Sequence, residues 1–153
     1  MDRTIDEIRE LFAADRFATE RAGIKIDEAR KPEGGRGGLA RCTMEIAPGH
    51  SNAGGTVMGG AIFTLADFCF AVLSNAWEPV PCTATISASI RYVGTCRGKR
   101  LVGSAEMDRA GRTLLQAHCR IEDDLGNLVA LCEATFIRMA PPPPRPYASS
   151  KSI

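Results

Sequence analysis

Apolar residues follow a helical period near the N-terminus and in the middle of the chain. Ile5, Ile8, Leu11 and Phe12 recur at helical spacing between charged residues, which predicts an amphipathic helix over residues 2–18. Two short strands are expected next, over residues 23–30 and 39–46, with a glycine-rich loop between them. An apolar run then predicts a long central helix from about residue 59 to 75.

The pattern changes to a period of two after this helix. Over residues 83–93 apolar positions alternate with Thr85, Ser87, Ser89 and Arg91, as in a half-buried antiparallel strand. Three more strands are expected over residues 100–107, 113–122 and 127–139, and the short links between them predict a meander of successive strands. The whole order predicts an α+β fold in which an antiparallel sheet wraps around the central helix.

The predicted elements form one domain. At 153 residues the chain is long enough for a single hydrophobic core, which we place in residues 1–139. Residues 140–153 are rich in proline and are expected to form a disordered tail.

Composition and charge exclude several classes of protein. The 19 basic and 18 acidic residues give a net charge of +1, so nothing favours nucleic-acid binding, which depends on neutralising phosphates. No apolar run reaches the length of about 18 residues that a membrane span needs. The first twenty residues mix acids and bases and lack the apolar core of a signal peptide, so a cytoplasmic protein is expected.

Neither cysteine nor histidine is spaced for a metal site. The 6 cysteines form no C-x-x-C pair, and the 2 histidines, His50 and His118, lie far apart. We interpret the cysteines as small hydrophobic residues of the core.

Four glycines precede the central helix, at positions 54, 55, 59 and 60. Such turns can bind phosphate, but this one has neither the G-x-G-x-x-G pattern nor the lysine of a P-loop. Gly59 and Gly60 instead open the helix with unpaired N–H groups. Such groups can polarise a carbonyl and stabilise an oxyanion.

Asp67 is an unusual residue for an apolar helix. At about 100° per residue it lies roughly 140° from the centre of an apolar stripe, on a side shared with small and aromatic residues. The stripe comprises Ile62, Leu65, Ala66, Cys69 and Leu73, and the side of Asp67 also holds Gly60, Phe63, Ala71 and Ser74. A helix that is apolar nearly all round is expected to be covered by its own sheet and by a partner. Asp67 is either a polar residue at the rim of the core or a functional carboxylate.

The run from Asn52 through Gly59 and Gly60 to Leu-Ala-Asp at 65–67 resembles a known family signature. It is similar to that of hotdog-fold acyl-CoA thioesterases of the phenylacetate-degradation type, and the strand over residues 83–94 resembles the strand that follows in that family. The resemblance covers residues 38–139. It implies hydrolysis of an acyl-CoA or acyl-carrier-protein thioester, with coenzyme A as part of the substrate and no metal or redox cofactor.

The resemblance also implies roles for individual residues. Asp67 would activate water or attack the thioester, the Gly59 amide would polarise its carbonyl, Asn52 would position water or substrate, and Thr85 would assist the nucleophile. The site would lie between the subunits of a homodimer or homotetramer, with Asp67 and Thr85 of one chain facing Asn52 and Gly59 of the other. This arrangement accounts for the separation of roughly 12 Å between Gly59 and Asp67 along the helix.

One position departs from the family pattern. Met58 stands where the family has histidine, and a thioether donates no hydrogen bond. We expect Met58, Gly60 and His50 to border the substrate. The alternatives are an acyl-CoA-binding module without turnover and a hotdog dehydratase, whose histidine the central helix lacks. The basic turn at 96–100 could meet the phosphates of coenzyme A or be an ordinary solvated turn.

Overall fold

The structure, a computed structural model, describes residues 1–140. Its elements are α1 (Ile5–Phe12), a π-helical turn η1 (Phe17–Arg21), β1 (Ile24–Arg30), β2 (Gly37–Glu45), a 3₁₀ turn η2 (Pro48–His50), α2 (Gly59–Asn75), β3 (Thr83–Tyr92), β4 (Arg100–Ala110), β5 (Leu114–Asp123) and β6 (Leu128–Arg138). The predicted central helix and six strands are confirmed. The predicted tail, except Ala140, lies outside the described residues.

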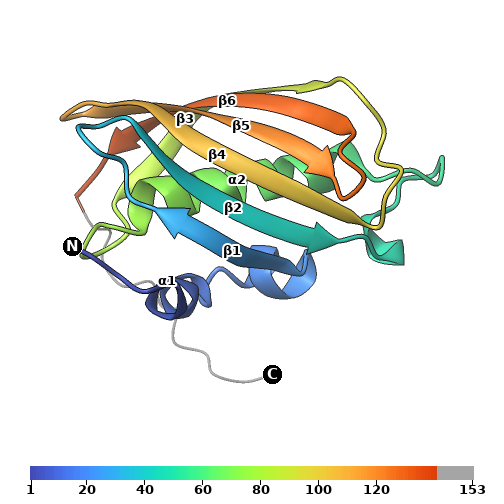
Figure 1. Cartoon of the computed structure of the whole chain (residues 1–153), viewed down its shortest axis with the longest axis horizontal. Coiled ribbons are helices and arrows are strands. Elements are labelled where there is room, and N and C mark those ends of the chain that lie inside the picture. The colour runs from blue at the N-terminus through green and yellow to red at the C-terminus, as the bar shows by residue number, and fades with distance from the viewer. Residues whose placement is uncertain (141–153) are drawn as a thin grey trace.

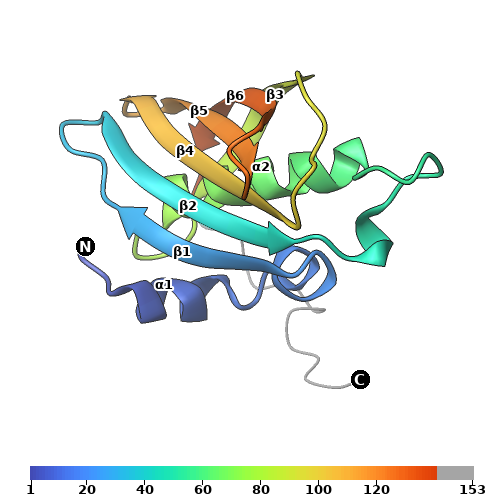
Figure 2. The same cartoon turned by 45° about the vertical axis from the view of Figure 1, so that its right-hand side comes forward.

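The strands form one antiparallel sheet in the order β1-β2-β4-β5-β6-β3, which curves around α2 (Figure 1 and Figure 2). Register shifts interrupt the strand pairs, for example between Ile26 and Glu28 and between Met107 and Arg109. Such bulges bend a strand and increase its twist, which helps the sheet to wrap. The predicted α+β arrangement is confirmed.

The prediction of a meander of successive strands is wrong for β3. This strand pairs with β6, with Thr85 opposite Phe136 and Ile90 opposite Cys132. The link after Tyr92 therefore carries the chain back across the end of the sheet to β4. Alternation along a strand records which face is apolar and carries no information about which strand lies beside it.

The predicted half-burial of β3 is also wrong. Most of its residues are exposed, and Ile86 is 57% exposed. The strand lies at the edge of the sheet, and the register shift between Thr85 and Ser87 interrupts the alternation at Ile86. Ile90 packs against the core, whereas Ile86 and Tyr92 stay exposed.

The N-terminal helix is shorter than predicted. It begins with a capping box, in which Thr4 Oγ1 accepts from Glu7 N and Glu7 Oε2 accepts from Thr4 N. It ends at Phe12, and η1 follows after a break. Phe12 and Ala18 are both buried, although a straight helix would place them about 120° apart around its axis. The break allows both to reach the core.

Helix α2 forms the centre of the hydrophobic core. The whole predicted apolar stripe is buried, and so are Phe68, Phe70 and Val72 on its flanks. The helix packs closely on β4, where a Cβ at Gly103 would lie 2.7 Å from Cys69 Sγ. Ser74, which lies on the side of Asp67, is buried near the C-terminal end of the helix. Cys42, Cys69, Cys119 and Cys132 are buried as expected.

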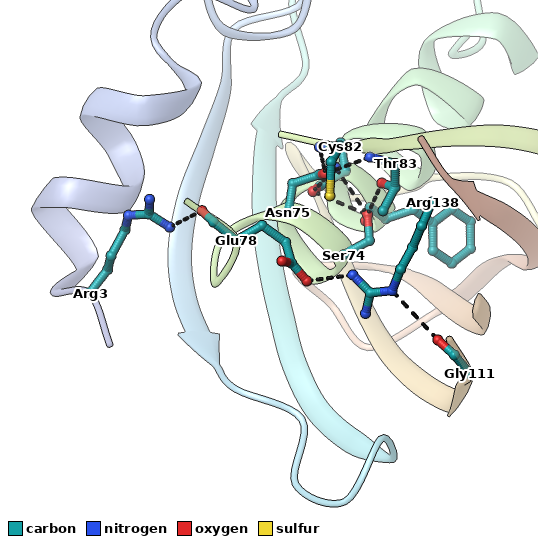
Figure 3. A network of polar contacts seen from close by, with 10 residues as sticks. Arg3, Ser74, Asn75, Glu78, Cys82, Thr83, Gly111 and Arg138 are labelled. Carbon is teal, nitrogen blue, oxygen red and sulfur yellow. Dashed lines mark hydrogen bonds and ion pairs between the residues drawn. The ribbon is translucent and has the colours of Figure 1, made fainter. Parts of the chain in front are cut away.

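A polar network fixes the C-terminal end of α2 (Figure 3). Asn75 Oδ1 accepts from Cys82 N at 2.9 Å and from Thr83 N at 3.0 Å, while Asn75 Nδ2 donates to Ala71 O. Glu78 next to it pairs with Arg138 at the end of β6. The side chain of Asn75 thus sets where the chain leaves the helix and enters β3.

Replacing Asn75 by alanine should lower the free energy of unfolding by about 2 kcal/mol or more, because two backbone N–H groups lose their acceptor. Urea denaturation followed by circular dichroism measures the change. Gln116→Ala, which removes an exposed amide on β5, is the control and should change stability little. Equal stability of the Asn75 variant and the wild type would contradict this role.

Candidate functional site

The N-terminus of α2 presents free backbone donors. Met58 is the N-cap residue and its side chain makes no capping hydrogen bond. Its carbonyl accepts from the N–H groups of Ala61 and Ile62, whereas within residues 1–140 no acceptor engages those of Gly59 and Gly60. These two donors, together with the positive end of the helix dipole, can stabilise negative charge on an oxygen.

Tyr92 holds this helix start in place, a role that sequence reasoning missed. Its hydroxyl donates to Gly59 O at 2.8 Å, and a Cβ at Gly59 would lie 3.0 Å from the ring. Glycine at this position lets the Tyr92 ring approach closely, since a larger residue would push the ring aside. In the sequence Tyr92 is only the last apolar position of its strand, and this pattern does not predict its hydrogen bond to Gly59.

A cavity of about 260 Å³ opens beside this helix start. Its lining includes Val57, Gly59, Ile62, Tyr92, Thr95 and Cys96. It is too small for a whole acyl-CoA, but it lies next to the free donors. A narrow part of a ligand could reach them from here.

The loop before α2 is stabilised by its own side chains. Asn52 Oδ1 accepts from Gly54 N and Thr56 N, and Asn52 Nδ2 donates to Thr56 Oγ1. His50 Nδ1 accepts from Ala47 N, and His50 O accepts from Met58 N at 2.8 Å. Asn52 and His50 therefore shape the loop that leads to Met58 and, two residues later, to Gly60. The side chain of Met58 is 54% exposed.

Asp67 lies on the one face of α2 that the sheet leaves open. The residue is exposed, and Phe63, Thr64 and Ala71 beside it are only partly buried. Burial of its carboxyl among these neighbours raises the pKa of Asp67, and the nearby carboxylate of Asp15 raises it further. A carboxylate with a raised pKa is a stronger base.

The chain does not bring all the predicted site residues together. Gly59, Gly60 and Met58 meet Asn52 and His50 at one end of α2, while Asp67 lies about two turns away, roughly 12 Å along the axis. Thr85 is exposed on the edge strand β3. Among the described residues no side-chain hydrogen bond joins Thr85 to Asp67.

The loop after the cavity carries basic side chains on a fixed backbone. Asp123 Oδ2 accepts from Arg97 N and Gly98 N, and Asp124 Oδ1 accepts from Lys99 N. Hydrogen bonds from Asn127 and from these amides hold the pKa of Asp123 well below its usual range. In the described part of the chain, Arg97 and Lys99 have no ion-pair partner.

Two further features bear on the kind of site. Across residues 1–140, no group of three or more histidine, cysteine, aspartate or glutamate side chains could hold a metal ion. No described helix combines the length and hydrophobicity needed to cross a membrane.

Comparison with known proteins identifies the family. Residues 54–130, about half of the chain, match the model of the Thioesterase superfamily. The chain belongs to this superfamily. A "Putative esterase" of Archaeoglobus fulgidus is 30% identical over 103 residues, which are 67% of this chain and 66% of that protein. A relative of the same name from Deinococcus radiodurans is 37% identical over 103 residues, or 65% of this chain and 68% of that protein.

Solved structures share the fold. The E. coli PaaI protein from the phenylacetic acid degradation operon superposes with a TM-score of 0.74 at 18% identity, over 90% of this chain and 98% of that one. A mutant of the phenylacetic acid degradation protein PaaI from Thermus thermophilus gives a TM-score of 0.68 at 25% identity, over 80% and 98%. A Haemophilus influenzae thioesterase gives a TM-score of 0.73 at 16% identity, over 90% and 91%. The hotdog fold and the resemblance to thioesterases of the phenylacetate-degradation type are confirmed.

Proposed function

We propose that this protein hydrolyses an acyl-CoA or acyl-carrier-protein thioester to a free acid and a thiol. The observation that carries the proposal is the pair of chemical groups on α2: free N–H donors at Gly59 and a carboxylate of raised pKa at Asp67. Superfamily membership supports hydrolysis of an ester or thioester bond, and the two groups supply what that reaction needs.

In the proposed reaction the Gly59 amide polarises the thioester carbonyl. Asp67 either removes a proton from the attacking water or attacks the carbonyl carbon to form an anhydride, which water then hydrolyses. The tetrahedral oxyanion is stabilised by the helix N-terminus and collapses as the C–S bond breaks. The departing thiolate takes its proton from Asp67 in the first route and from solvent water in the second. Asn52 positions the water or substrate, Thr85 assists the nucleophile, and Met58, Gly60 and His50 border the acyl group.

The proposed site needs two copies of the chain. Gly59 and Asp67 of one copy are too far apart to act on the same carbonyl, and the open face of α2 leaves Asp67 accessible. The edge strand β3 is exposed and carries Ile86 and Tyr92, which are 57% and 50% exposed, and Val93 directly after it is 49% exposed. An uncovered apolar edge favours pairing with another strand. A homodimer through β3, or a homotetramer built from two such dimers, would bring Asp67 and Thr85 to the partner's Gly59.

We expect Asp67→Asn to lower kcat by on the order of 10²–10⁴-fold, because the amide neither accepts a proton at neutral pH nor attacks a thioester. Free-thiol release from short, long and aromatic acyl-CoAs measures the loss. Glu133→Gln, which neutralises an exposed acid on β6, is the control and should keep wild-type rates.

Other outcomes favour the alternatives. If the wild type binds acyl-CoA without releasing thiol, the protein is a binding module, and Met58 in place of the family histidine is the sequence feature that fits it. Hydration of an enoyl-CoA without thiol release would indicate a dehydratase. A fully active Asp67→Asn would refute the catalytic assignment.

Charge at the edge strand should separate the subunits. Ile86→Lys places like charges at the proposed interface, so we expect a monomer in analytical ultracentrifugation and a matching loss of thioesterase activity. Leu125→Lys alters another exposed apolar residue, 67% exposed in the β5–β6 turn, and should remain oligomeric and active. A wild type that is active as a monomer would contradict the shared site.

The basic turn at residues 96–100 allows a test of whether the protein recognises the coenzyme A part of an acyl-CoA substrate. If Arg97 and Lys99 contact the phosphates of coenzyme A, Arg97→Ser with Lys99→Ser should raise KM for acyl-CoA several-fold, and more at low salt. KM for the matching acyl-pantetheine, which lacks those phosphates, should not change. Arg112→Ser, in the turn between β4 and β5, is the control. An unchanged KM for acyl-CoA would show that the loop is an ordinary solvated turn.

A further inference from the structure

The start of α2 is fixed through a carbonyl group rather than by a capping side chain. Helices commonly begin with a serine, threonine, aspartate or asparagine whose side chain accepts from an N–H group of the first turn. Met58 makes no such bond, and within residues 1–140 the N–H groups of Gly59 and Gly60 have no acceptor. The hydroxyl of Tyr92 instead donates to Gly59 O at 2.8 Å. The helix start thus gains a hydrogen bond without losing a donor.

This hydrogen bond acts on the peptide group that joins the two glycines. Gly59 O and the N–H of Gly60 are opposite ends of that group. A carbonyl oxygen has two lone pairs, so Tyr92 can bind it in addition to the N–H group that the helix supplies. A bond donated to the oxygen polarises the group and strengthens its N–H as a donor, by about 10–30%. Tyr92 therefore acts on the donor of Gly60 without touching it.

Strand β6 holds the backbone of Tyr92 in place. Tyr92 pairs with Ala130, which is buried. Val93 and Gly94 after it both donate their N–H groups to Val129 O, at 2.9 and 3.1 Å. The link from β3 to β4 then passes beside the start of α2 (Figure 1 and Figure 2). A strand in the interior of the sheet thus sets where the hydroxyl meets the helix.

The side chain of Tyr92 is suited to act as a permanent donor. Its ring lies against Gly59 and forms part of the lining of the cavity of about 260 Å³ beside the free N–H groups. Burial raises the pKa of Tyr92, so the hydroxyl keeps its proton at neutral pH. The oxygen of Gly59 can only accept, and the phenol supplies the proton for this bond.

We propose that Tyr92 is a positioning residue of the proposed active site, and that its hydroxyl orients and polarises the peptide between Gly59 and Gly60. The N–H of Gly60 then serves as a second oxyanion donor beside that of Gly59. The inference rests on the proposed function, in which the start of α2 stabilises the tetrahedral oxyanion. Tyr92 acts through the peptide group and need not touch the substrate.

Tyr92→Phe tests the proposal, because phenylalanine keeps the ring against Gly59 and removes only the hydroxyl. We expect kcat for acyl-CoA hydrolysis to fall about 10-fold, less than the roughly 10²–10³-fold that loss of a whole oxyanion donor costs. KM should change by less than about twofold, because the bond acts on the transition state and not on substrate binding. Tyr147→Phe makes the same change at the other tyrosine of the chain and should keep wild-type rates.

Two further measurements separate positioning from a structural role. The N–H groups of Ala61 and Ile62 donate to Met58 O, and their hydrogen exchange should be equally fast in Tyr92→Phe and in the wild type. Analytical ultracentrifugation should give the wild-type oligomer, although Tyr92 belongs to the proposed interface strand β3. Faster exchange in this first turn, dissociation of the oligomer or an unchanged kcat would overturn the proposal.

A measurement that needs no turnover keeps this test separate from that of the proposed function. The ¹H chemical shift of the Gly60 amide reports how strongly its N–H is polarised. It should move upfield in Tyr92→Phe and stay in place in Tyr147→Phe. Such a change supports the polarising contact even if the wild type releases no thiol. An unmoved Gly60 signal refutes the proposal even if the wild type is an active thioesterase.

Discussion

The need to cover α2 governs the rest of the structure. This helix is apolar on nearly every side, so exposing it would cost roughly 25 cal/mol for each Å² of apolar surface left in water. Bulges curve the sheet around it, Gly103 lets β4 approach Cys69, and the N-terminal segment packs Phe12 onto Phe68. A single sheet of six strands still leaves one face of α2 open.

The open face of α2 accounts for the position of the candidate carboxylate, Asp67. A carboxylate is tolerated at Asp67 because this face is partly accessible, whereas the same group on the stripe of Leu65 and Cys69 would be buried without a partner. The edge strand β3 borders the uncovered region and exposes its own apolar residues. The incomplete burial of α2 thus explains both why Asp67 is accessible and why a surface is left that we propose a second copy of the chain covers.

Local signals in the sequence were sufficient for α2 and for the approximate positions of the six strands, but not for the length of α1 or for the order of the strands in the sheet. Helix α2 begins at Gly59 and ends at Asn75 as predicted, because the glycine pair and the apolar run leave few alternatives. The pairing of β3 with β6 could not be predicted, since residues 83–92 would alternate in the same way beside any strand. The hydrogen bond from Tyr92 to Gly59 joins residues 33 positions apart, for which one sequence holds no signal.

The two halves of the candidate site depend on different kinds of group. At Gly59 the donor is the backbone, so the side chain of Met58 leaves the N–H group and the helix dipole unaffected. At Asp67 the group that we propose as base or nucleophile is a side chain, and its pKa is raised by burial and by the carboxylate of Asp15. Changes in the side chains around Asp67 can therefore alter the proposed base without altering the donors, while Tyr92 constrains the donors through its hydrogen bond to Gly59.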